Sequence, residues 1–114
     1  MSFMEALRSR AKMIEDRKVW AKKVAYAAKI IMPDAEVYVF GSVIGEDATG
    51  GSDVDMLIVF QNISEKALER AKIKVEIKEM AGLPLYHPFE IHLASKDETE
   101  QYFIIAGKHI AKIS

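Results

Sequence analysis

Residues 37–60 constrain the fold of this chain more than any other stretch of its sequence. The segment holds two apolar, strand-like runs, 37–40 and 54–60, separated by a polar, glycine-containing loop. The first run ends at Gly41-Ser42, and the second begins directly after Asp53. Because the second run is apolar at nearly every position, it is typical of a central strand covered on both faces of a sheet.

Two carboxylates, Asp53 and Asp55, stand at the head of the second run. Residues i and i+2 of an extended chain point to the same face, so we predict that these side chains project together while Val54 points into the core. Carboxylates that share a face repel each other, and divalent cations relieve that repulsion. Mg²⁺ prefers one or two carboxylates together with water and substrate phosphates, and a pair of metal ions stabilises an in-line phosphoryl displacement. The pattern therefore predicts metal-dependent phosphoryl chemistry.

Gly41-Ser42, a loop of ten residues (43–52) and Asp53-x-Asp55 at the head of an apolar strand together resemble the minimal nucleotidyltransferases of the DNA polymerase β superfamily. The resemblance covers roughly residues 29–112. It implies an α/β (α+β) chain with a small mixed β-sheet flanked by helices, the polymerase β-like nucleotidyltransferase fold. Residues 1–114 then form a single minimal nucleotidyltransferase domain.

The same resemblance implies a two-metal site built from three carboxylates. Asp53 and Asp55 would bind the metal ions, and the family has a third carboxylate on a later strand. Glu90, in the predicted strand 90–94, matches it and would also help to deprotonate the acceptor hydroxyl. His92 lies two residues further and shares that face. Two roles stay open for His92: contact with the metal site or acceptor, or a hydrogen bond to a neighbouring side chain.

Phosphate binding would fall to the residues around the loop. Glycine lets a phosphate approach the main chain closely, and Ser42 adds a hydroxyl and an N–H group. By resemblance, Gly41, Ser42 and Ser52 hold the phosphates of the nucleotide. Many family members carry an arginine shortly after the Gly-Ser pair, but residues 43–46 of this chain contain no cation. Neutralisation of the triphosphate is then left to metal or to a residue elsewhere.

The function implied is transfer of a nucleoside monophosphate, AMP in the first place, from an NTP to a hydroxyl with Mg²⁺ or Mn²⁺. Minimal members of the family act as antitoxins that modify a helical partner of the HEPN type with AMP. The resemblance therefore implies a HEPN-type partner protein as acceptor. The alternative is a catalytically weak NTP- and Mg²⁺-binding or partner-binding module, which the missing arginine favours.

Composition excludes several other classes of protein and of metal site. The chain has no cysteine, so disulfides and zinc–thiolate sites are excluded. No apolar run approaches the ~18 residues of a membrane span, and a cytoplasmic location is expected.

Residues 1–32 hold eight Lys/Arg and three Asp/Glu. This basic segment suggests an anionic partner or a solvated helix face, whereas direct nucleic-acid binding is not expected. Homo-oligomerisation stays open.

Helical periodicity predicts one long helix over residues 3–31 with at most one break. Its first part, 3–13, would extend beyond the core and meet a partner. An apolar stripe along the rest of this helix is expected to pack on the sheet. The apolar residues on that stripe are Met13, Trp20, Val24, Ala27 and Ile31.

A second helix is predicted to begin at Ser64 and to stop at Gly82. Ser64 would be its N-cap, and Ile63 would pack on Leu68 as a hydrophobic staple. Residues 73–78 alternate like a strand, but flanks rich in Ala, Glu and Lys favour a helix.

The last helix is predicted over residues 96–106. Ser95 and Glu98 form the capping-box pattern that marks its start. The tail 109–113 mixes apolar and polar residues, and it is expected to be either a fraying end or a partner contact.

Overall fold

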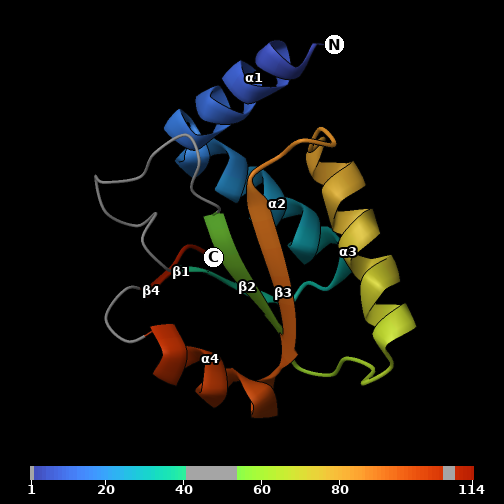
Figure 1. Ribbon diagram of the computed structural model, residues 1–114. Helices are drawn as coiled ribbons and strands as arrows, with labels where there is room; N and C mark the ends of the chain where they lie inside the picture. The colour runs from blue at the N-terminus through green and yellow to red at the C-terminus, as the bar shows by residue number, and fades with distance from the viewer. Residues whose placement is uncertain (1, 41–53, 107–109) are drawn as a thin grey trace.

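The computed structural model describes residues 2–40, 54–106 and 110–114, which form helices packed on a mixed sheet (Figure 1). The predicted α/β architecture is confirmed. None of the helices in these ranges is long and apolar enough to span a bilayer. The elements in chain order are α1 (Phe3–Glu15), α2 (Arg17–Ile31), β1 (Glu36–Phe40), β2 (Val54–Phe60), α3 (Ala67–Ala81), β3 (Phe89–Ser95), the short 3₁₀ helix η2 (Lys96–Glu98), α4 (Thr99–Ala106) and β4 (Ile110–Lys112).

The sheet has four strands in the order β3-β2-β1-β4. β1 pairs antiparallel with both β2 and β4, whereas β2 and β3 run parallel and are joined through α3. Of the two predictions for the C-terminal tail, the fraying end is wrong, because residues 110–112 form an edge strand, and contact with a partner stays a prediction. The tail gives β1 its second neighbour, and paired backbone groups on an inner strand are more favourable than an open edge.

Alternation along the strands divides the buried residues into two layers. The larger layer lies between the sheet and helices α2 and α3, with Val54, Met56 and Ile58 of β2 at its centre. The smaller layer lies on the other face, where Leu57 and Val59 face α4. The nearly unbroken apolar run of β2 is explained by this double coverage, as predicted for a central strand.

The long N-terminal helix is interrupted once, at Asp16, as the sequence predicted. Met13, Val24 and Ala27 of the predicted stripe are buried, and Trp20 and Ile31 pack partly buried against the same layer. Figure 1 shows α1 leading away from the sheet at the N-terminal end. Only the last turn of α1 reaches the core, at Met13 and Ile14.

The predicted start of the second helix is wrong by two residues, because α3 begins at Ala67 and its N-cap is Lys66 instead of Ser64. Ser64 Oγ accepts the N–H of Lys66 in a local turn ahead of the helix. Leu68 is 69% exposed, so it makes no staple with Ile63, which packs on the main core instead. The predicted stop is confirmed: Gly82 has φ 71°, the left-handed conformation that favours glycine.

Arg70 ties the start of α3 to the end of β3. Its Nε donates to the carbonyl oxygen of Ser64 at 2.7 Å, and its Nη1 donates to that of Leu93 at 3.3 Å. Its Nη2 lies 2.6 Å from Glu98 Oε1, which also accepts the N–H of Ser95 in the predicted capping box. The capping box is confirmed, although it opens the short 3₁₀ helix η2 before α4 begins.

Stability is expected to depend on this ion pair between neutral and acidic pH. The Arg70 guanidinium lowers the pKa of Glu98 from 4.5 to about 2. A carboxyl whose pKa is lower in the folded state stabilises the fold above its ordinary pKa, and that contribution is lost as the pH falls from about 4.5 through about 2. The side chain of Glu98 is 42% exposed, so solvent screening limits the effect to about 1 kcal/mol.

Urea denaturation of the wild type and Glu98→Gln at several pH values measures this contribution. The free energies of unfolding should differ by about 1 kcal/mol at pH 7 and converge near pH 2. Glu100→Gln, at an exposed position of α4, is the charge-matched control and should follow the wild type. A difference that stays constant with pH would contradict the role of the Glu98 charge.

Candidate active site

The parallel register of β2 and β3 brings an acidic pair together. Asp55 lies opposite Glu90, and two positions further along, Leu57 lies opposite His92. Because alternate residues share a face, Asp55, Glu90 and His92 project from the same side of the sheet. The predicted proximity of Glu90 and His92 is confirmed, and Asp55 joins them from the neighbouring strand.

The three side chains converge on one small volume, which we call the Asp55 cluster. His92 Nε2 lies 3.4 Å from Asp55 Oδ1 and 4.0 Å from Glu90 Oε1. One donor atom from each residue falls within 4.8 Å of the others. The exposed fractions of the side chains are 32% for Asp55, 59% for Glu90 and 27% for His92, so a solute from the solvent can reach the cluster.

Two aromatic residues border the cluster on the buried side. Phe40 lies opposite Asp55 in the β1–β2 register. The centroid of its ring is 5.7 Å from the centroid of the His92 ring. The centroid of the Tyr102 ring, on α4, lies 5.8 Å from the centroid of the His92 ring. These neighbours restrict the imidazole and leave its Nε2 edge toward the carboxylates. No sequence pattern indicated Tyr102, because only the packing of α4 on the sheet brings it next to His92.

The donor set fits a divalent cation. Carboxylate oxygens are the ligands that Mg²⁺ and Mn²⁺ prefer, and an imidazole nitrogen is a common additional ligand for transition metals. The carboxylates stand on adjacent central strands, whose backbone hydrogen bonds fix their spacing. The cluster can therefore hold a cation on a rigid support and still leave coordination positions open to solvent.

Four of the predicted site residues lie outside the described residues: Gly41, Ser42, Ser52 and Asp53. The segment that holds them connects Phe40 to Val54, which are the last and first residues of β1 and β2. Phe40 and Val54 therefore lie at the end of the sheet where Asp55 lies.

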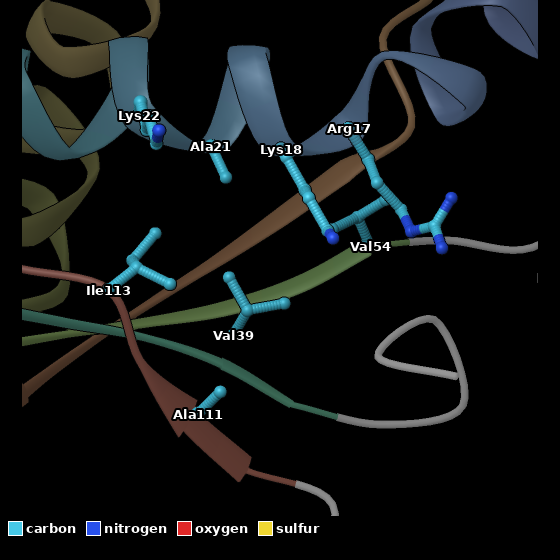
Figure 2. Close-up of a pocket in the computed structure, with 8 residues that line it drawn as sticks. All are labelled: Arg17, Lys18, Ala21, Lys22, Val39, Val54, Ala111 and Ile113. Atoms are coloured by element: carbon cyan, nitrogen blue, oxygen red, sulfur yellow. The ribbon is translucent and has the colours of Figure 1, made fainter. Parts of the chain in front are cut away.

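A separate cavity of about 230 Å³ lies on the opposite face of the sheet, between α2 and strands β1 and β4 (Figure 2). The basic side chains at its border are Arg17, Lys18 and Lys22, and its apolar lining is Ala21, Val39, Val54, Ala111 and Ile113. Val54 and Asp55 point to opposite faces, so none of the Asp55 cluster contributes to this cavity. The basic border does not neutralise the acidic cluster.

The comparisons with known proteins identify the family. Residues 1–94 match the model of the central palm domain of mitochondrial-like poly(A) RNA polymerase, a span that includes all of β2 and the Glu90 and His92 positions of β3. The chain belongs to this family. It is a palm domain of the nucleotidyltransferase type, and the resemblance drawn from the sequence is confirmed at that level.

Solved structures support the same fold for this palm domain. A candidate nucleotidyltransferase from Sulfolobus solfataricus matches with a TM-score of 0.60 at 22% identity, over 94% of this chain and 84% of the other. A second candidate nucleotidyltransferase matches with a TM-score of 0.63 at 26% identity, over 82% of this chain and 96% of the other. No curated protein matches the sequence.

Proposed function

We propose that this palm domain transfers a nucleoside monophosphate, AMP in the first place, from an NTP to a hydroxyl group. Asp53, Asp55 and Glu90 would hold two divalent cations, Mg²⁺ or Mn²⁺. The observation that carries the proposal is the register that sets Asp55 beside Glu90, at the end of the sheet where the segment with Asp53 joins β2. The family match supplies the reaction class.

In the proposed reaction the acceptor oxygen attacks the α-phosphorus of the NTP in line with the leaving group. The new oxygen–phosphorus bond forms as the bond to the bridging α–β oxygen breaks, and pyrophosphate leaves. Bound cations would supply charge neutralisation for the attacking and leaving oxygens. Glu90 is more exposed than Asp55, and it would accept the proton of the acceptor hydroxyl. Gly41, Ser42 and Ser52 would hold the phosphates.

The proposed acceptor is a HEPN-type helical partner, which would place this chain in the antitoxin role. α1 supports an interaction with such a partner because it leads away from the sheet and carries exposed apolar residues. Phe3 is 77% exposed, Met4 56% and Leu7 44%. Exposed apolar side chains gathered on one helix mark a contact surface more often than scattered ones do.

A weak NTP- and Mg²⁺-binding or partner-binding module remains the second candidate. The absence of a cation at residues 43–46 favours it, because a triphosphate would then be neutralised mainly by metal. Partner binding alone gives no reason to hold two carboxylates side by side, since like charges at that spacing repel without a cation.

Incubation with α-labelled NTPs and Mg²⁺ or Mn²⁺, with and without a HEPN-type partner, tests the proposal. Intact-mass analysis of both chains should show a gain of one or more nucleotidyl groups, and Asp53→Asn should abolish the gain. Metal-dependent NTP binding without any mass gain would favour the binding module. Failure of the chain to bind NTP in the presence of either metal would overturn the transferase and the NTP-binding module, and would leave only the partner-binding module.

The contact surface on α1 has its own test. Replacing Leu7 by glutamate is expected to weaken the complex with a HEPN-type partner at least roughly tenfold, because a charge would be buried among apolar groups. Leu85→Glu is the matched control, since Leu85 is 99% exposed in the loop before β3. Isothermal titration calorimetry of both variants gives the comparison, and equal affinities would place the interface elsewhere.

A further inference from the structure

We propose that His92 is an additional protein ligand of the metal at Asp55 and Glu90, and that its nitrogen makes the site prefer Mn²⁺ to Mg²⁺. This inference rests on the proposed function and extends it. The resemblance drawn from the sequence implies carboxylates alone and leaves the choice of metal open. The structure adds an imidazole from the same strand as Glu90, aimed at the same point.

The distances fit coordination of one ion. Ligands that each lie ~2.1 Å from an octahedral ion are ~3.0 Å apart when adjacent and ~4.2 Å apart when opposite. His92 Nε2 lies 3.4 Å from Asp55 Oδ1 and 4.0 Å from Glu90 Oε1, within that span. All three donor atoms lie within 4.8 Å of one another, so side-chain adjustments on the two paired strands would bring them onto one ion.

A simple hydrogen bond explains the geometry less well. N–H···O hydrogen bonds have donor–acceptor distances near ~2.9 Å, and few extend past ~3.2 Å. The 3.4 Å separation between His92 and Asp55 is longer than that, and the second carboxylate lies on the same side of the imidazole. One nitrogen spaced in this way from two carboxylate oxygens is compatible with a cation bound between them.

Neighbouring aromatic rings and the strand backbone hold the imidazole of His92 in place. Phe40 and Tyr102 lie against the His92 ring, and the backbone of β3 is fixed by its pairing with β2. A ligand that is already oriented loses little conformational entropy when metal binds. The position of His92 therefore contributes to affinity as well as to the choice of ion.

The nitrogen ligand decides between the two ions. Mg²⁺ takes oxygen ligands almost exclusively and dehydrates reluctantly, whereas transition metals accept imidazole readily. Mn²⁺ combines acceptance of imidazole with the carboxylate and phosphate preferences that the proposed reaction needs. A site with two carboxylates and one imidazole should therefore bind Mn²⁺ more tightly than Mg²⁺.

The test uses the full chain with Mn²⁺ alone, without nucleotide. Electron spin echo envelope modulation of bound Mn²⁺ should show coupling to a ¹⁴N nucleus, and the coupling should disappear in His92→Gln. The Mn²⁺ dissociation constant should rise about tenfold or more in that variant, since even changes to groups behind a ligand cost ~10–100-fold in affinity. The Mg²⁺ constant should change far less. His87→Gln, in the loop before β3, is the matched control and should retain the coupling.

Asp55→Asn separates failure of this inference from failure of the proposed function. If Asp55→Asn abolishes Mn²⁺ binding but the wild type shows no ¹⁴N coupling, the metal site stands and His92 is not a ligand. If neither Asp55→Asn nor His92→Gln changes Mn²⁺ binding, the ion sits elsewhere and both proposals fail. Substoichiometric Mn²⁺ should also broaden the His92 ring resonances of the wild type, and the absence of broadening would overturn the inference.

Discussion

Replacing Asp55 by asparagine is expected to lower nucleotidyl transfer by roughly 10³-fold or more, because a metal clamp on the reacting oxygens supplies several kcal/mol of transition-state stabilisation. An amide keeps the shape of the side chain but removes the negative charge that holds a divalent cation. The carboxylate of Glu90 on the neighbouring strand cannot replace it, since the two side chains contribute different ligands to the same cluster. Single-turnover measurement with saturating NTP and metal checks the expected loss.

The fold should survive this substitution. Asp55 is one-third exposed, and its removal relieves repulsion from Glu90 in the absence of metal. The melting temperature of Asp55→Asn without metal should therefore equal or exceed that of the wild type. Asp97→Asn, at an exposed position of η2, is the charge-matched control and should keep full activity. Transfer by Asp55→Asn within a few-fold of the wild-type rate would exclude Asp55 from the catalytic machinery.

The sequence predicted part of this site and not the rest, for a physical reason. Alternation along an extended chain depends only on local geometry, so the common face of Glu90 and His92 was predictable. The register that places Asp55 opposite Glu90 is set by pairing between strands that are distant in the sequence. A slip of one residue would turn one of the two carboxylates to the other face, and no local pattern rules that out.

The ends of helices and strands also divide into those that the local sequence predicts and those that depend on distant contacts. Gly82 and the Ser95–Glu98 capping box were predictable because they act within a few residues. The start of α3 was not, because Arg70 binds the carbonyl oxygen of Ser64 and holds residue 64 outside the helix. Strand β4 is too short for alternation to appear in its sequence, and it forms only because β1 offers an open edge.

Replacing Ile77 by alanine is expected to destabilise the chain by ~2–5 kcal/mol, the usual cost of emptying a buried isoleucine site. Ile77 is fully buried where α3 packs on the sheet. Domains of this size have a total free energy of unfolding of only ~5–15 kcal/mol, so the loss is a large fraction of the whole. Chemical denaturation monitored by the fluorescence of Trp20 measures it.

Val75→Ala provides the matched control on the same helix and also tests the helix itself. Residues 73–78 alternate like a strand, and in a strand Val75 and Ile77 would share one face. In the helix, Ile77 and Ala81 are buried one turn apart, whereas Val75 is 53% exposed. Val75→Ala should therefore change the free energy of unfolding by no more than ~0.5 kcal/mol. Equal losses at both positions would contradict the helix, and with it the crossover that makes β2 and β3 parallel and sets Asp55 beside Glu90.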